Sequence, residues 1–103
     1  MLDKQDSLNY ASEFLSKIRK NGIEIKIAKL FGSCSRSETH EYSDIDLLLV
    51  SDSFIGVGFI DNKLLAKELI EYDKIQVKTY NYKDYLERDP FIDEIEKTAI
   101  TIH

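Results

Sequence analysis

The sequence predicts an α/β fold: a small mixed sheet of three or four strands flanked by about four helices, in the order α-β-α-β-α-β-α. Two observations predict it. Segments with apolar residues at helical spacing alternate along the chain with segments in which apolar and polar residues alternate. Such an order places helices against the faces of a sheet. The 103 residues contain four glycines and one proline, and no linker or repeat, so residues 1–103 are expected to form a single domain.

The first half of the chain contains one predicted helix and two predicted strands. Residues 6–20 carry apolar residues at helical spacing, and residues 23–31 alternate isoleucine with polar residues, which is typical of a strand. Residues 32–43 are small and polar and predict a turn with a short helix. A second strand, apolar enough for burial on both faces, is predicted over residues 44–50. The relative orientation of the two strands stays open.

The second half repeats the alternation. A helix is predicted over residues 60–72, a strand over 74–80, a short helix from 81–85, a last helix starting at Pro90, and an edge strand over 100–102. The helix over 60–72 is expected to bury its five apolar residues at helical spacing. These are Ile60, Leu64, Leu65, Leu69 and Ile70.

Charge and composition exclude several classes of protein. Fourteen Lys and Arg against nineteen Asp and Glu give a net charge of −5, which argues against DNA or RNA as a partner. No apolar run approaches the roughly 20 residues that span a bilayer, and the N-terminus lacks the apolar region of a signal peptide. The only cysteine, Cys34, allows no internal disulfide. These features predict a cytoplasmic protein that does not enter a membrane.

A glycine and two polar residues follow the first predicted strand. Gly32 lets the backbone approach a ligand closely, Ser33 adds a hydroxyl, and Arg36 adds a guanidinium three residues later. Backbone N–H groups at the start of a helix bind phosphate. The segment is therefore a candidate phosphate-binding turn, and the alternative is an ordinary Gly-Ser turn without a ligand.

Two aspartates open the second predicted strand. Asp44 and Asp46 are two residues apart, so their side chains project from the same face with Cα atoms about 6–7 Å apart. Like charges so close repel, and carboxylate oxygens suit Mg²⁺ or Mn²⁺. The pair is a candidate metal site; alternatively, the two residues merely begin the strand.

Together, these segments resemble a known family more closely than either does alone. The motifs GSCSRS and SDIDL, each joined to a predicted strand, are similar to the signature of the minimal nucleotidyltransferase family, within the DNA-polymerase-β-like nucleotidyltransferase superfamily. The family pattern is Gly-Ser-x-x-Arg-Gly followed by Ser-Asp-x-Asp-Leu. The predicted order of elements extends the resemblance over nearly the whole chain. Ser37 departs from the pattern, which has glycine there.

The resemblance implies metal-dependent transfer of a nucleoside monophosphate, expected to be AMP, from ATP or another nucleoside triphosphate to a hydroxyl group. It implies that Gly32, Ser33 and Arg36 bind the nucleotide and that Asp44 and Asp46 are catalytic ligands of Mg²⁺ or Mn²⁺. The family has a third carboxylate on the next strand, where this chain has Gln76. Glutamine offers an oxygen to a metal but cannot act as a base.

The resemblance also implies a protein partner. Small members of the family are often encoded beside an all-helical HEPN protein and act as its antitoxin by transferring AMP to one of its tyrosines. Gln76 favours an alternative, a catalytically degenerate nucleotide-binding domain that acts on its partner by binding alone. Transfer to a small molecule such as an aminoglycoside fits less well, because those enzymes carry further domains for the acceptor. The nucleotide preference, the acceptor and the oligomeric state stay open, and a homo-oligomer is compatible with the sequence.

Overall fold

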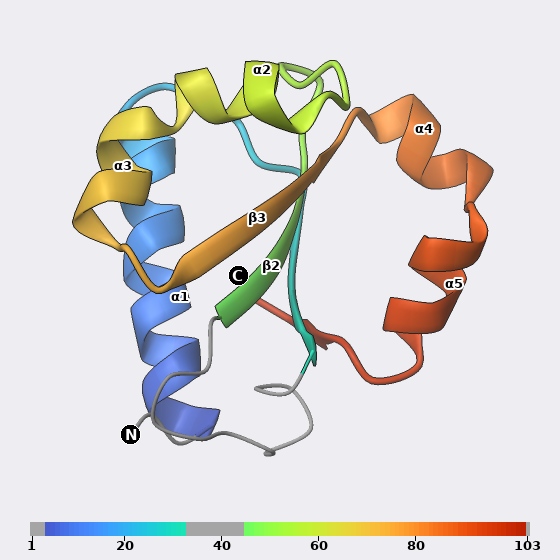
Figure 1. The fold of residues 1–103 in the computed structure, drawn as a ribbon, viewed down its shortest axis with the longest axis horizontal. Coiled ribbons are helices and arrows are strands. Elements are labelled where there is room, and N and C mark those ends of the chain that lie inside the picture. The colour runs from blue at the N-terminus through green and yellow to red at the C-terminus, as the bar shows by residue number, and fades with distance from the viewer. Residues whose placement is uncertain (1–3, 33–44, 103) are drawn as a thin grey trace.

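A computed structural model of the chain describes residues 4–32 and 45–102 (Figure 1). The predicted alternation of helices and strands is confirmed. Along the chain the elements are α1 (Lys4–Lys20), β1 (Ile27–Phe31), β2 (Ile45–Val50), α2 (Gly58–Leu64), α3 (Ala66–Glu71), β3 (Ile75–Tyr80), α4 (Tyr82–Glu87), α5 (Pro90–Glu96) and β4 (Ile100–Thr101). The short helix expected within residues 32–43 lies almost wholly outside the described residues.

The strands form one mixed sheet in the order β3-β2-β1-β4. β2 runs antiparallel to β1 and parallel to β3, and the short edge strand β4 runs antiparallel to β1. The connection between β2 and β3 contains α2 and α3, as a parallel pair requires. The orientation of β1 and β2, which the sequence left open, is therefore antiparallel.

Helices cover both faces of the sheet, with α1, α2 and α3 on one side and α4 and α5 on the other (Figure 1). The alternation of side chains along each strand sends Leu47 and Leu49 to the first layer and Leu48 and Val50 to the second. All four are fully buried. β2 is thus the central strand with two apolar faces, as its continuous apolar run predicts.

The helix predicted over residues 60–72 is two short helices, α2 and α3, joined at Leu65. The prediction that its apolar residues form a buried face was largely wrong. Leu65 is buried, but Ile60, Leu64 and Ile70 are exposed. The buried positions include two carboxylates instead, which are Asp61 and Glu68.

Asp61 shows why a charged residue is buried there. Its carboxylate accepts hydrogen bonds from the backbone N–H groups of Ile55 and Gly56, at 3.0 and 2.9 Å, and from the Thr79 hydroxyl at 2.8 Å. Three donors offset the cost of removing the charge from water. Asp61 therefore ties the loop after β2 to β3, which hydrophobic spacing alone does not reveal.

The first predicted strand is shorter than expected. Residues 23–26 precede β1 rather than forming part of it, although Ile25 is buried in the core. By contrast, the last helix begins at Pro90 as predicted. Asn81 caps α4 by accepting from the Lys83 N–H, and Asp89 caps α5 by accepting from the Ile92 N–H.

Tyr80 gives the fold a measurable dependence on alkaline pH. Burial, together with the hydrogen bond that the Tyr80 hydroxyl donates to Asp89 at 3.0 Å, raises the pKa of Tyr80 to about 12. An unfolded tyrosine titrates near 10. Because the folded-state pKa is the higher one, its stabilising contribution is fully present below about pH 10 and is lost as the pH rises through about 12.

We expect the free energy of unfolding to fall by about 2 kcal/mol more in the wild-type protein than in Tyr80→Phe between about pH 9.5 and pH 12. Urea denaturation at a series of pH values measures it. Tyr80→Phe keeps the ring in the core and removes the titrating hydroxyl, so it is the matched control. Parallel pH profiles for the two proteins would contradict the assignment.

Candidate functional site

Three paired residues form a row across one end of the sheet. Phe31 at the end of β1 pairs with Asp46 near the start of β2, and Asp46 pairs with Gln76 near the start of β3. Paired residues on neighbouring strands project from the same face. That face is the one that carries α4 and α5, because Leu48, two residues after Asp46, is buried in the same layer as helix α5.

Gly32 lies directly beside Asp46. Its φ angle is +77°, which glycine adopts readily and other residues do not. A Cβ atom at this position would lie under 3.0 Å from Oδ2 of Asp46, closer than real Cβ contacts come. The backbone angle therefore favours glycine, and a larger residue here would displace the Asp46 carboxylate. The structure brings the predicted Gly32 and Asp46 together.

Gln76 occupies the β3 position next to Asp46. The strand pairs without interruption from Ile75 to Tyr80, so its register places Gln76, and not the preceding Asp73, beside Asp46. Glu71, the other carboxylate near the start of β3, forms an ion pair with Lys17 at 2.9 Å. Among the described residues, β3 thus presents a neutral amide to Asp46 where the sequence predicted one.

The other predicted site residues, Ser33, Arg36 and Asp44, lie outside the described residues. Cys34 lies there as well. The described part of the site therefore consists of Gly32, Asp46 and Gln76.

The donor atoms present suit a hard divalent cation. Asp46 contributes carboxylate oxygens and Gln76 an amide oxygen, and Mg²⁺ is commonly bound by one or two carboxylates together with substrate phosphates and water. In the described ranges 4–32 and 45–102, no group of three or more His, Cys, Asp and Glu side chains is placed to hold a metal. Asp46 and Gln76 therefore fit a Mg²⁺ site that is completed by further oxygen ligands.

A cleft of about 190 Å³ opens next to Gly32, between the end of β1 and helix α5. Its lining combines one aromatic ring with charged and polar side chains of α5 and the turn that follows. The lining residues are Phe31, Gly32, Glu94, Ile95, Lys97 and Thr98. The row of paired residues is therefore bordered by a small, partly open space on the α5 side.

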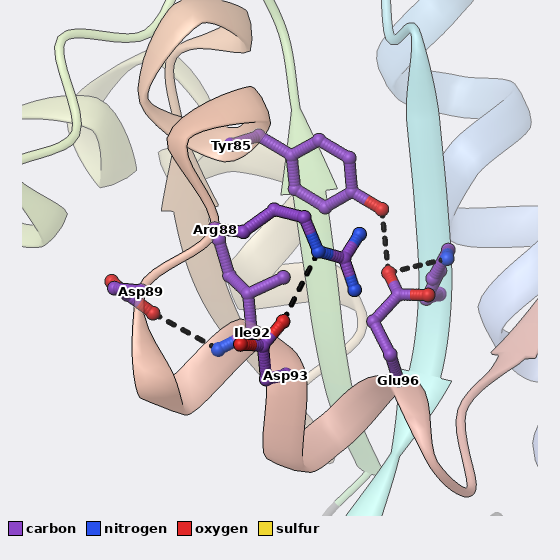
Figure 2. A network of polar contacts seen from close by, with 7 residues as sticks. Tyr85, Arg88, Asp89, Ile92, Asp93 and Glu96 are labelled. Atoms are coloured by element: carbon purple, nitrogen blue, oxygen red, sulfur yellow. Dashed lines mark hydrogen bonds and ion pairs between the residues drawn. The ribbon is translucent and has the colours of Figure 1, made fainter.

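A partly buried network of hydrogen bonds joins helix α5 to β1 (Figure 2). Glu96 accepts hydrogen bonds from Lys29 at 2.6 Å and from the Tyr85 hydroxyl at 2.5 Å. The hydrogen bond from Lys29, followed by that from Tyr85, lowers the pKa of Glu96, while burial raises the pKa of Tyr85. The network joins β1, α4 and α5 and so sets the distance of α5 from the row.

No motif in the sequence marks this network, because its partners come from three separate segments of the chain. Glu96 follows the buried Ile92 by four residues, so helical spacing does place it on the inward face. Asp89 also has structural partners: it caps α5 and accepts a hydrogen bond from the Tyr80 hydroxyl. Asp93 forms an exposed ion pair with Arg88 at 3.1 Å (Figure 2).

Within the described residues no helix is both long enough and apolar enough to cross a bilayer. The longest, α1, has 17 residues with polar residues on its outer side.

Residues 9–102 match the family model described as the nucleotidyltransferase domain. No match was found among curated proteins. A protein described as a candidate nucleotidyltransferase from Sulfolobus solfataricus superimposes with a TM-score of 0.70 at 16% identity, covering 95% of this chain and 80% of that one.

Two further solved structures are toxin-antitoxin complexes. One, containing AMP-PNP, matches with a TM-score of 0.58 at 18% identity. The other is a mutant MntA-HpeT complex in which two aspartates, two positions apart, are replaced by glutamate; it matches with a TM-score of 0.57 at 17% identity. Each match covers 87% of this chain and 70% of the other. At these identities the likeness shows a shared fold. Since the family model spans almost the whole chain, the chain belongs to the nucleotidyltransferase domain family, the family of the minimal nucleotidyltransferases.

Proposed function

We propose that residues 1–103 form a single catalytic domain that transfers AMP from ATP to a hydroxyl group of a protein partner, with Mg²⁺ or Mn²⁺ as cofactor. The observation that carries the proposal is the contact between Gly32 and Asp46 at the end of the sheet. In this proposal the glycine at the end of one strand belongs to a phosphate-binding turn, and the carboxylate at the start of the next strand is a metal ligand. Membership of the nucleotidyltransferase family supports the same chemistry.

The residues divide between two tasks in this proposal. Gly32 and Ser33 hold the β- and γ-phosphates, and Arg36 neutralises part of their charge. Asp44 and Asp46 would hold the divalent cation, which would supply positive charge to stabilise the phosphates. In the structurally similar MntA-HpeT complex, the two aspartates that were replaced stand two positions apart, as Asp44 and Asp46 do in this chain.

During transfer, the acceptor hydroxyl oxygen forms a bond to the α-phosphorus, and the bond from that phosphorus to the oxygen bridging to the β-phosphate breaks. Pyrophosphate leaves. Gln76 cannot take the hydroxyl proton because an amide is not basic, so the proton passes to another base, such as water or a carboxylate of the site. The chain contributes mainly by positioning the reactants and by placing charge beside the phosphates.

We further propose that the acceptor is a tyrosine of an all-helical HEPN-type protein and that the chain acts in the cytoplasm as the antitoxin of the pair. Two of the structural neighbours are toxin-antitoxin complexes, and one of them contains the ATP analogue AMP-PNP. Both observations favour ATP as the nucleotide and a protein as the partner.

Gln76 favours a second candidate function, which is nucleotide-dependent binding of the partner without transfer. A neutral amide beside Asp46 removes one negative charge and one possible base from the site. The two functions differ in one respect: only the enzyme moves the α-phosphate.

The test is incubation of the wild-type chain with Mg²⁺, the product of the neighbouring gene, and ATP labelled at either the α- or the γ-phosphate. Nucleotidyl transfer moves the α-label to the partner and leaves the γ-label in pyrophosphate. Label transfer from the γ-position would contradict the proposal, since it indicates a kinase-type reaction. Tight binding of ATP and partner with no transfer of either label would establish the second function.

A further inference from the structure

Resting on the proposed function, we infer that Phe91 is the platform of a subsite that binds a planar aromatic group of one substrate. The subsite comprises Phe91, Phe31 and Lys78. The aromatic group is either the base of the nucleotide or the ring of an acceptor tyrosine, and both share the flat apolar surface that stacks on phenylalanine.

Phe91 lies at the border of the row formed by Phe31, Asp46 and Gln76. Its ring makes an edge-to-face contact with Phe31, with centroids 5.8 Å apart and an interplanar angle of 88°. Phe31 is the direct partner of Asp46 and precedes Gly32. A group bound to the phosphates or metal at Asp46 is therefore one side chain away from the Phe91 ring.

Phe91 remains substantially exposed although it belongs to a packed helix. It is 41% exposed, whereas Ile92 and Ile95 on the same helix are at most 7% exposed. The packed part of the ring contacts Phe31 and lies near Lys78 of β3, and the rest of the ring is open to solvent. An exposed ring at this place offers apolar contact area to a substrate.

Lys78 supplies positive charge on the same side. Its ammonium group lies 5.7 Å from the centroid of the Phe91 ring. It projects from the same face of β3 as Gln76, two residues earlier. A cation beside an aromatic ring suits a nucleobase, which is linked to phosphates, and it also suits a tyrosine ring, whose hydroxyl oxygen attacks.

Helix α5 is held firmly at both ends, so the platform is preorganised. At its start, Asp89 accepts the Ile92 N–H at 2.9 Å, and Pro90 fixes the first turn. At its end, Glu96 binds Lys29 and Tyr85 (Figure 2). Phe91 is the second residue of this helix, so its backbone is already ordered and substrate binding loses little conformational entropy there.

The experiment compares Phe91→Ala with Phe91→Tyr, which keeps the ring, and with Leu86→Ala, which removes an exposed apolar side chain on α4. Calorimetry measures the affinity for ATP and for inorganic tripolyphosphate, both with Mg²⁺. Label transfer measures KM and kcat for the acceptor protein. Circular dichroism confirms that each variant is folded.

If the nucleobase stacks on Phe91, Phe91→Ala weakens ATP binding about tenfold and leaves tripolyphosphate binding unchanged. If the acceptor ring stacks there, the variant raises the KM for the acceptor about tenfold at unchanged ATP affinity. In either case Phe91→Tyr and Leu86→Ala behave like the wild type. If Phe91→Ala behaves like Leu86→Ala in every measurement, the inference is wrong, and the proposed function is unaffected. A wild-type chain that binds neither ATP nor tripolyphosphate would overturn both.

Discussion

Asp46→Asn is expected to reduce transfer of the α-label to the partner by about 10²-fold or more, with the fold intact. The substitution keeps the size of the side chain, removes its charge and replaces one acceptor oxygen with an NH2 donor. The carboxylate is half-buried at the start of β2, beside Gly32 and Gln76. With Gln76 neutral, no charged side chain of β3 pairs with this position to replace it. Initial rates of label transfer measure the effect.

Asp52→Asn is the matched control. It makes the same chemical change just beyond the other end of β2, where Asp52 forms an exposed ion pair with Lys26 at 3.3 Å. Exposed pairs contribute little to stability, so we expect wild-type rates. Equal rates for Asp46→Asn and the wild type would show that the Asp46 carboxylate has no role in the transfer.

Gly32→Ala is the second change with a large expected effect, and it acts through geometry rather than charge. At φ +77° an alanine is strained by about 1–2 kcal/mol. Its Cβ also meets Oδ2 of Asp46 at under 3.0 Å, so the carboxylate must move. We expect a loss of about tenfold or more in transfer rate, because small displacements of reacting groups are costly.

Gly22→Ala separates the two causes. Gly22 has a similar φ of +89° at the end of α1, and nothing lies within 4 Å of the position of its Cβ. Its substitution is expected to cost about 1 kcal/mol of folding free energy and to leave the transfer rate unchanged. Urea denaturation and label transfer on both variants measure this difference. A rate loss in Gly22→Ala as large as in Gly32→Ala would attribute the effect to stability alone.

Much of the fold follows from local patterns. The unbroken apolar run of β2 predicts a strand covered on both faces, and Pro90 marks the start of α5. The apolar face of α2 and α3 could not be predicted in this way. Asp61 is buried there because three donors from distant segments satisfy it, and such donors come together only in the folded chain.

The candidate site was predictable to a similar extent. Spacing along a strand and the family motif single out Gly32 and Asp46, and aligning the apolar residues of β3 singles out Gln76. The contribution of α5 was not predictable. Phe91 approaches Phe31 because Glu96 binds Lys29, a contact between residues 67 positions apart in the sequence. Neither periodicity nor a motif encodes such a pairing.

The most direct test of the site is a calorimetric titration of ATP into the wild-type chain and into Asp46→Asn, each with Mg²⁺ and with the metal chelated. The end of the sheet at Gly32, Asp46 and Gln76 is expected to bind ATP only when Mg²⁺ is present. Asp46→Asn is expected to lose that metal-dependent binding. Wild-type affinity that is unchanged by chelation, or equal affinities for the two proteins, would contradict a metal-dependent nucleotide site at this position.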